Sequence, residues 1–368
     1  MTPLFFFGTL RHPALIEAVL GDVAHLQLSD AAVSDYAIEA VAEGPFPTIV
    51  ARQGSQGPGL LVEGVTKADL KRLDFFERSF GYELKDVMLA DGTKASAYLP
   101  QLGLWTADGA WSLETWVETW GALSVFAARE VMRYMGQKSP DDIAQMFPMI
   151  RARAWSHLNA LQSRHGAGTL MGKVDVVERR RVYAQYFALD EFDLSHARFD
   201  GSMTPILMRG VFLAPDAALV LPYDPVRDRV LVVEQMRMGP LARGDHVVWQ
   251  LEPVAGRLDP GESPEDAARR EAREETGLNI GALHPVGECY GSPGNSSEFH
   301  YSYVGLVDLP DQAAGVGGLA SEDEDIRSHV MPFDELLRLC DAQQIANSPL
   351  VLIAYWLARH QARLRASS

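Results

Sequence analysis

Three glutamates that can hold a metal ion stand close together in one short stretch of the chain. Glu271, Glu274 and Glu275 are spaced at i, i+3 and i+4, so on a helix their carboxylates lie on one face within about one turn. Like charges at this spacing destabilise an isolated helix by roughly 0.2 to 0.5 kcal/mol per pair. A hard divalent cation would offset this cost, and we expect Mg²⁺, with Mn²⁺ as the alternative.

The flanking residues predict the helix that carries these glutamates. Ser263 supplies a capping hydroxyl and Pro264 suits the first helical position. Glu265 and Asp266 place negative charge at the positive end of the helix dipole. Gly277 is expected to end the helix in the left-handed conformation.

The whole stretch 256–278 fills a longer pattern: G, five residues, E, seven residues, R-E-U, one residue, E-E, one residue, G-U, where U is aliphatic. A loose E-x-x-E-E match alone would favour a solvated acidic helix face. Because all nine fixed positions are filled together, the stretch is identified as a Nudix box. The resemblance implies hydrolysis of a nucleoside diphosphate linked to another moiety.

Sequences on both sides of the box narrow the resemblance. The segments are LPYDPVRDRVLVVEQMRMG (221–239), LEPVAG (251–256), SPGNSSE (292–298) and GLASEDEDIRSHV (318–330). Together they resemble the ADP-ribose pyrophosphatases over about 190 residues, from Val174 to the end. The implied reaction is Mg²⁺-dependent cleavage of the ADP-ribose pyrophosphate, which gives AMP and ribose 5-phosphate.

The same resemblance assigns roles to individual residues. The implied metal ligands are Glu271, Glu275, Glu324 and the carbonyl of Ala255. The implied catalytic residues are Glu322 as general base, Glu274 beside the ions, and Arg270 as the partner that orients a box carboxylate, Glu262. The implied substrate contacts are Arg209, Arg237 and Glu298.

Two short motifs near the N-terminus resemble the γ-glutamyl cyclotransferase-like family over about the first 110 residues. They are Phe7-Gly8-Thr9-Leu10 and Leu73-Asp74-Phe75-Phe76-Glu77. The resemblance implies that Glu77 is a catalytic acid/base in ring closure to 5-oxoproline and that the Gly8 and Thr9 amides hold the substrate. Phe7 stands where the family usually has Tyr. The alternative is a domain kept for recognition or packing, with Glu77 an ordinary carboxylate.

Composition limits the classes of partner. The 368 residues exceed one ordinary domain, and 47% hydrophobic with 22% charged residues indicates a soluble globular protein. Two cysteines predict a reducing, cytoplasmic location, and no signal peptide or membrane span is expected. A formal net charge of −16 argues against nucleic acid as a partner.

The predicted fold class is α+β followed by α/β/α. Residues 1–120 form a γ-glutamyl cyclotransferase-like mixed β domain with helices, residues 121–172 a helical connector and linker, and residues 173–368 a Nudix fold with a mixed sheet between helices. Strands within 173–212 lie outside the core Nudix fold and are expected to form a homodimer. Four tryptophans, at positions 105, 111, 116 and 120, are expected to pack where two domains meet.

Three functional alternatives remain open at this stage. The same machinery could hydrolyse another nucleotide sugar such as GDP-mannose. The protein could instead be a γ-glutamyl cyclotransferase whose Nudix domain senses nucleotide, or a scaffold with neither activity. The pairing of the two domains further resembles the tellurite-resistance-associated Nudix proteins of some bacteria.

Overall fold

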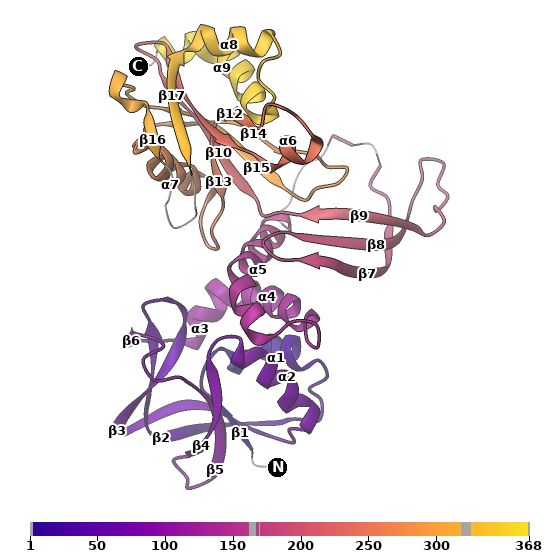
Figure 1. Cartoon of the computed structure of the whole chain (residues 1–368). Helices are drawn as coiled ribbons and strands as arrows, with labels where there is room; N and C mark the ends of the chain where they lie inside the picture. The colour runs from indigo at the N-terminus through magenta and orange to yellow at the C-terminus, as the bar shows by residue number, and fades with distance from the viewer. Residues whose placement is uncertain (1–2, 162–166, 169, 318–324, 367–368) are drawn as a thin grey trace. The chain divides into compact units, whose positions relative to one another are not determined.

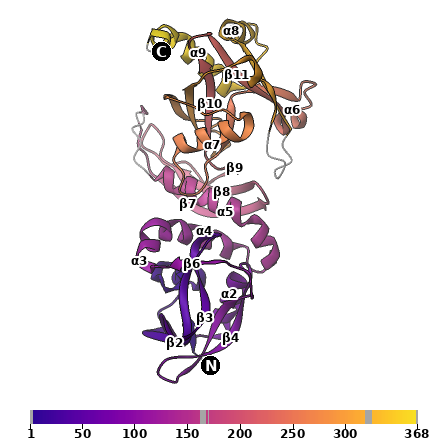
Figure 2. The same ribbon diagram turned by 90° about the vertical axis from the view of Figure 1, so that its left-hand side faces the viewer.

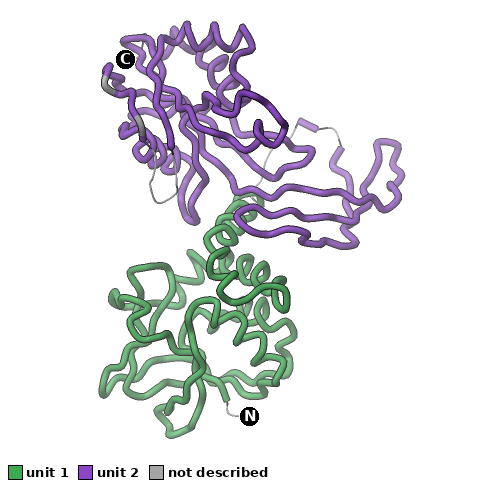
Figure 3. The backbone as a smooth tube through the Cα atoms, in the orientation of Figure 1, with its two compact units in different colours: residues 1–163 green, residues 164–368 purple. Residues whose placement is uncertain are grey.

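The computed structural model describes residues 3–161, 167–168, 170–317 and 325–366. The chain separates into two compact units, residues 1–163 and residues 164–368 (Figure 3). Unit 1 has one sheet and unit 2 has two, and each unit has its own buried apolar core. Within the described part of the chain, no helix has both the length and the apolar character needed to cross a membrane.

Unit 1 is built on a six-stranded sheet (Figure 1). In pairing order its strands are β4 (Tyr82–Met88), β5 (Lys94–Pro100), β1 (Leu4–Phe6), β3 (Gly44–Glu63), β2 (Gln27–Val41) and β6 (Ala107–Ala110). The buried apolar run of β1 pairs parallel to β5 and antiparallel to β3. The predicted opening strand therefore lies inside the sheet, between β5 and β3, and the loop with Gly8 and Thr9 begins at its end.

Helices pack beside this sheet. They are α1 (Pro13–Leu20), α2 (Lys67–Arg78), α3 (Leu113–Trp116), α4 (Ala122–Arg133) and α5 (Pro140–Ala160), with the short turns η1 (Thr9–Arg11) and η2 (Val117–Gly121). Reciprocal hydrogen bonds between Thr66 and Asp69 begin α2, and Ser139 and Asp142 begin α5 in the same way. Helix α4 packs against α1 and α5, so α4 and α5 belong to the compact body of unit 1.

Unit 2 opens with a separate antiparallel sheet of three strands, β7 (Val174–Ala184), β8 (Ala188–His196) and β9 (Leu207–Leu213). The end of β9 is tied to the loop that precedes β15. The Phe212 amide donates to the Asn295 carbonyl (2.8 Å), and the Ser297 amide donates to the Phe212 carbonyl (2.9 Å). These bonds anchor the small sheet beside the main one.

The main sheet of unit 2 is mixed. In pairing order it contains β14 (Leu283–Tyr290), β15 (Phe299–Leu306), β10 (Ala217–Asp224), β11 (Arg229–Met236), β17 (Ile326–Pro332) and β16 (Gly315–Gly317), while β12 (Trp249–Glu252) pairs with β11 and β13 (Val254–Arg257) with β10. Strands β10 and β15 are parallel, and the other pairs are antiparallel. The hairpin predicted around residues 224–228 is confirmed as β10 and β11.

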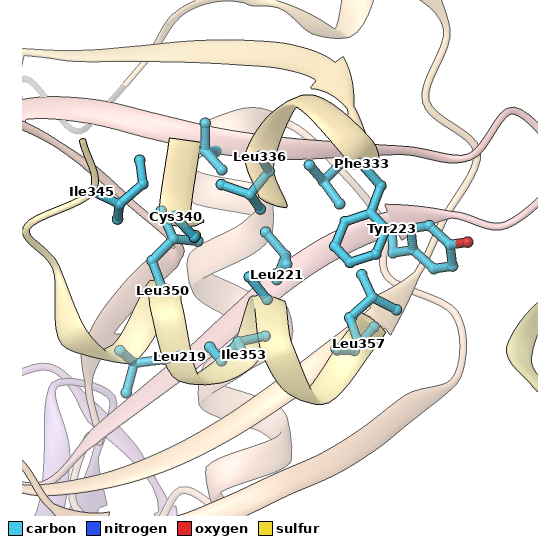
Figure 4. Close-up of a cluster of buried hydrophobic side chains, with 14 of the residues drawn as sticks. Leu219, Leu221, Tyr223, Phe333, Leu336, Cys340, Ile345, Leu350, Ile353 and Leu357 are labelled. Carbon is cyan, nitrogen blue, oxygen red and sulfur yellow. The ribbon is translucent and has the colours of Figure 1, made fainter. Parts of the chain in front are cut away.

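Helices cover both faces of this sheet (Figures 1 and 2). Alternate residues of β10, Leu219, Leu221 and Tyr223, pack against α8 (Phe333–Asp341) and α9 (Ser348–Ala366), as Figure 4 shows. Helix α7 (Pro264–Thr276) packs against β10 and β13 through its buried alanines. A short helix, α6 (Met238–Arg243), and the turn η3 (Asp311–Ala313) complete the unit. The predicted mixed sheet between helices is confirmed.

Candidate active site

Helix α7 has the ends that its sequence predicts. The Ser263 hydroxyl accepts a hydrogen bond from the Asp266 amide (3.1 Å) and donates one to the Asp266 carboxylate (2.7 Å). Gly277 follows the last turn in the left-handed conformation, with φ of 71°. Glu271, Glu274 and Glu275 are therefore all on one regular helix, held at both ends by residues of the same motif.

Glu271 lies directly against the backbone of β13. A Cβ atom built on Gly256 would stand 1.8 Å from Oε1 of Glu271, so any other residue at this position would displace this carboxylate. Gly256 follows Ala255, whose carbonyl is an expected metal ligand. The glycine at the first position of the motif thus brings the helix carboxylate beside the strand that carries Ala255.

Arg270 connects the carboxylates of the motif. Its Nε and Nη2 donate to the two oxygens of Glu262, each at 2.9 Å, and its Nη1 donates to Glu271 (2.7 Å) and Glu274 (3.0 Å). Hydrogen bonding to Glu262 and the charges of these carboxylates raise the pKa of the Arg270 guanidinium. The contact with Glu262 is the one that the sequence analysis assigned to Arg270. Its contribution to catalysis stays a prediction.

Glu275 is the most buried glutamate of the motif, with only 3% of its surface exposed. A Cβ atom on Gly317 would lie 2.2 Å from the carbonyl oxygen of Glu275, so the end of β16 touches the last turns of α7. Glu322 and Glu324, the predicted base and fourth metal ligand, lie outside the described residues.

The residues brought together here fit a hard divalent ion by their chemistry. All the expected ligands are carboxylate or carbonyl oxygens, the donors that Mg²⁺ prefers. In the part of the chain that the structure describes, no three acidic, histidine or cysteine side chains form a metal-binding group. Glu271 and Glu274 are both ion-paired with Arg270.

An ion pair between the partly exposed Arg237 and the buried Glu252 was not predicted. Arg237, which directly follows β11, donates to Glu252 of β12 through Nε (2.8 Å) and Nη2 (2.6 Å). Only 8% of the Glu252 side chain is exposed, and Glu252 precedes Ala255 by three residues. The one feature of the sequence that could have indicated this pair is Glu252, the single acidic residue of the LEPVAG segment. Arg237 was predicted to contact substrate, and in this structure it orients toward Glu252.

The two remaining predicted substrate contacts lie on other elements. Arg209 is an exposed residue of β9, and its Nη1 donates to the neighbouring Met208 carbonyl (2.9 Å). Glu298 precedes β15 and lies 3.3 Å from the ring of His300. No contact joins either of them to the glutamates of α7 among the described interactions, so their roles stay predictions.

In unit 1 the structure brings the three predicted residues to one cavity. Gly8, Thr9 and Glu77 all line it, although Glu77 is almost 70 positions from the loop that follows β1. Glu77 is half-buried and lines the cavity. Three of the four tryptophans, Trp105, Trp116 and Trp120, line the same cavity and thus lie inside unit 1. The sequence predicted that they would pack between domains.

Comparison with family models assigns the two units separately. A model described as "NUDIX domain" matches residues 213–350, and one described as "Gamma-glutamyl cyclotransferase, AIG2-like" matches residues 4–113. The first match contains α7 and the glutamates on it. The second contains β1, α2 and Glu77, and it ends where α3 begins.

Individual relatives are more specific. The chain is 39% identical over 192 residues to the ADP-ribose pyrophosphatase of Escherichia coli (strain K12), a match that covers 52% of this chain and 91% of the relative. It is 32% identical over 196 residues to that of Haemophilus influenzae (53% and 90%). It is 29% identical over 185 residues to the GDP-mannose pyrophosphatase of Escherichia coli O1:K1 / APEC (50% and 95%).

Among solved structures, "Crystal structure of ADP compounds hydrolase" is similar to this chain with a TM-score of 0.40 and 21% identity, over 51% of this chain and 96% of that one. The assignment therefore depends on the sequence comparisons, which agree with the motif and with the mixed sheet between helices. This chain belongs to the ADP-ribose pyrophosphatase family of NUDIX-domain proteins and carries, in addition, a γ-glutamyl cyclotransferase-like domain.

Proposed function

We propose that unit 2 hydrolyses ADP-ribose to AMP and ribose 5-phosphate, with Mg²⁺ as cofactor and Mn²⁺ as the alternative. The observation that carries this proposal is the 39% identity over 91% of an ADP-ribose pyrophosphatase. The geometry of α7 supports it, because the carboxylates that the reaction needs are held on one rigid helix beside β13.

The chemistry requires charge neutralisation and a base. A divalent ion held by Glu271, Glu275 and the Ala255 carbonyl would neutralise the pyrophosphate and acidify bound water. Arg270 forms ion pairs with Glu262, Glu271 and Glu274, and its positive charge offsets the repulsion among these three carboxylates.

The base accepts a proton from the attacking water. As the water oxygen bonds to phosphorus, the anhydride P–O bond breaks and the leaving phosphate departs with the bonding electrons. We assign the base to Glu322 on the family resemblance. Arg237 forms an ion pair with Glu252, which lies three residues before Ala255.

GDP-mannose is the second candidate substrate, since 29% identity extends over 95% of a GDP-mannose pyrophosphatase. The same carboxylates would serve that reaction. A nucleotide sensor coupled to a cyclotransferase is the candidate of a different class. The complete set of charged residues on α7 argues against it, because a sensor does not need every catalytic carboxylate.

We infer that the protein is a cytoplasmic homodimer. Its substrate is a small nucleotide, and it does not bind nucleic acid. Both cysteines, Cys289 and Cys340, are free, in keeping with a reducing compartment. The net charge of −16 opposes binding to polyanions unless metal ions mediate it. The likeness to tellurite-resistance-associated proteins stays a prediction.

The test is a substrate panel. The full chain is incubated with ADP-ribose, GDP-mannose and dinucleotides, each with Mg²⁺ or Mn²⁺, and AMP and GMP are measured by chromatography. We expect AMP from ADP-ribose as the fastest product, formed more slowly by Glu275→Gln and at an unchanged rate by Glu335→Gln, a partly exposed glutamate of α8 that pairs with Arg338. Faster release of GMP from GDP-mannose would contradict the proposal.

A further inference from the structure

The cavity in unit 1 is large enough for a small organic molecule. It encloses about 280 Å³, close to the lower end of the range of ligand pockets. The loop after β1 and helix α2 contribute Gly8, Thr9 and Glu77. Helices α4 and α5 contribute another part of its wall, and they lie beyond the residues that match the cyclotransferase-like model.

This added wall is aromatic. Trp116 and Trp120 come from the segment α3–η2, and Phe147 comes from α5. Phe147 packs edge-on against Phe80 with ring centroids 4.6 Å apart, and Phe80 packs in the same way against Phe76 at 5.1 Å. Such a wall favours a flat apolar body over a hydrated polar one, because aromatic contacts add to the burial of apolar surface.

Few charged residues line the cavity. Among its described lining residues they are Glu43, Glu77 and Arg151. Both carboxylate oxygens of the exposed Glu43 accept the Thr106 amide (3.1 and 3.0 Å). The Arg151 guanidinium lies 5.6 Å from the centre of the Trp120 ring. Among the described lining residues, Arg151 therefore places a positive charge beside the aromatic wall.

Glu77 is the acidic group inside the cavity, and its surroundings favour its neutral form. Burial raises the pKa of Glu77 to about 8. Burial, and after it the charge of Glu77, raises the pKa of Tyr82 of β4. For Tyr98 of β5, burial and the hydrogen bond and charge of Asp74 raise the pKa, and the charge of Glu77 adds a smaller effect. The Tyr98 hydroxyl donates to Asp74 (2.8 Å), so it does not donate to Glu77.

A ligand with both an ammonium group and a carboxylate would need two charge partners in this cavity. Its ammonium would require Glu77 in the ionised form, which burial disfavours at neutral pH. A ligand with a single carboxylate needs only Arg151. Its charge is then compatible with a protonated Glu77, which can donate a hydrogen bond.

We propose that this cavity binds a small aromatic monocarboxylate, with its ring packed against Trp120, Trp116 and Phe147 and its carboxylate held by Arg151. The γ-glutamyl compounds expected from the cyclotransferase-like resemblance carry an ammonium group as well and are the competing class of ligand. The proposal concerns unit 1 and is independent of the reaction of unit 2.

The test is calorimetric titration of the full chain with 3-phenylpropionate and indole-3-acetate. Phenylethylamine, propionate and γ-glutamylalanine are the comparison compounds. At pH 7 we expect saturable binding of the two aromatic acids and no binding of phenylethylamine or propionate. Arg151→Gln should weaken binding at least about tenfold, the loss of one ionic contact. Arg129→Gln should not, although Arg129 makes a similar contact with Phe126 at 5.8 Å on the exposed face of α4.

The pH dependence distinguishes the two classes of ligand. Ionisation of Glu77 places a second negative charge in the cavity, so the affinity for an aromatic acid should fall about tenfold from pH 7 to pH 9. Glu77→Gln should bind equally well at both values. A ligand held through its ammonium group would show the opposite: affinity would rise with pH and disappear in Glu77→Gln.

Three results would overturn the proposal. The first is no binding of either aromatic acid at millimolar concentration by a chain that is folded by circular dichroism. The second is binding of γ-glutamylalanine with the ammonium-type pH profile, and the third is release of 5-oxoproline from it. Trp116→Leu and Phe147→Leu serve as further variants if Glu77→Gln fails to fold. Each should weaken the binding of the aromatic acids, because it removes a ring of the cavity wall and leaves Arg151 in place.

Discussion

Gly256 and Glu271 touch: a side chain of even one carbon at position 256 would lie 1.8 Å from the Glu271 carboxylate. Strand β13 and helix α7 therefore meet at these two residues, which are 15 positions apart in the chain. This contact explains in physical terms why the motif begins with glycine, and it makes a direct prediction.

Replacing Gly256 with alanine should displace the Glu271 carboxylate. We expect kcat/KM for ADP-ribose to fall about 10²-fold, the usual cost of misplacing a catalytic group by about 1 Å. Stability should fall by less than the roughly 1 to 3 kcal/mol of core overpacking, because the Glu271 carboxylate is the end of a flexible side chain and can move aside. The measurements are steady-state kinetics with Mg²⁺ and thermal unfolding. Gly287→Ala in β14 is the control, because a Cβ there would meet nothing within 4 Å. Equal loss in both variants would contradict this account.

Replacing Arg270 with lysine should show whether its positive charge alone, or also the geometry of its hydrogen bonds, stabilises the site. Lysine keeps the positive charge but cannot make the two parallel bonds to Glu262, nor reach Glu271 and Glu274 at the same time. We expect a loss of stability of about 1.5 to 3 kcal/mol and lower activity. Urea unfolding measures the first and AMP release the second. The exposed Arg273→Lys, on the same helix, should be neutral. An unchanged Arg270→Lys would show that charge alone is sufficient.

Local sequence was enough to predict α7, because its capping residues, Ser263 and Gly277, act within one turn. It also predicted the β10–β11 hairpin, where two apolar runs flank a turn. The pairing of Arg237 with Glu252 could not be predicted, since it depends on how β11 and β12 align across 15 positions. The place of Trp120 was missed for a similar reason: the cavity that it lines is built from elements far apart in the chain, with α4 packed against both α1 and α5.

The small sheet of unit 2 should form the dimer. Its apolar side chains are more exposed than is usual for a soluble monomer, and they include Val174, Val176, Val182, Tyr183 and Met208. We expect light scattering at micromolar concentration to give twice the mass of one chain. Val176→Glu combined with Met208→Glu should give the mass of a monomer, because burying a charge at the interface is costly.

Val226→Glu is the matched control for the dimer. Val226 is 74% exposed in the turn between β10 and β11, far from these strands in sequence. This variant should stay dimeric. A monomeric parent protein at micromolar concentration would contradict the assignment of β7, β8 and β9 to an interface.

A protein that begins at Lys173 should retain most of the ADP-ribose activity. We propose that unit 1 contributes little to this reaction, since the strands, helices and glutamates described for the site all belong to residues 174–366. The measurement is kcat/KM for AMP release, compared with the full chain. If the shortened protein is soluble and dimeric but inactive, the two units share a site.

The last prediction separates metal binding from proton transfer. Glu275 is buried on the rigid helix α7, so Glu275→Gln should raise the Mg²⁺ concentration needed for half-maximal rate as well as lower the rate. Glu322→Gln should lower kcat by roughly 10² to 10⁴, the usual contribution of a general base, and leave Mg²⁺-dependent binding of ADP-ribose nearly unchanged. Both variants are compared by Mg²⁺ titration of the rate and by calorimetric binding of ADP-ribose. If Glu322→Gln turns over within a few-fold of the parent, the base is a glutamate of α7, and Glu274 is the first to test because Arg270 already holds its carboxylate on the same face as Glu271.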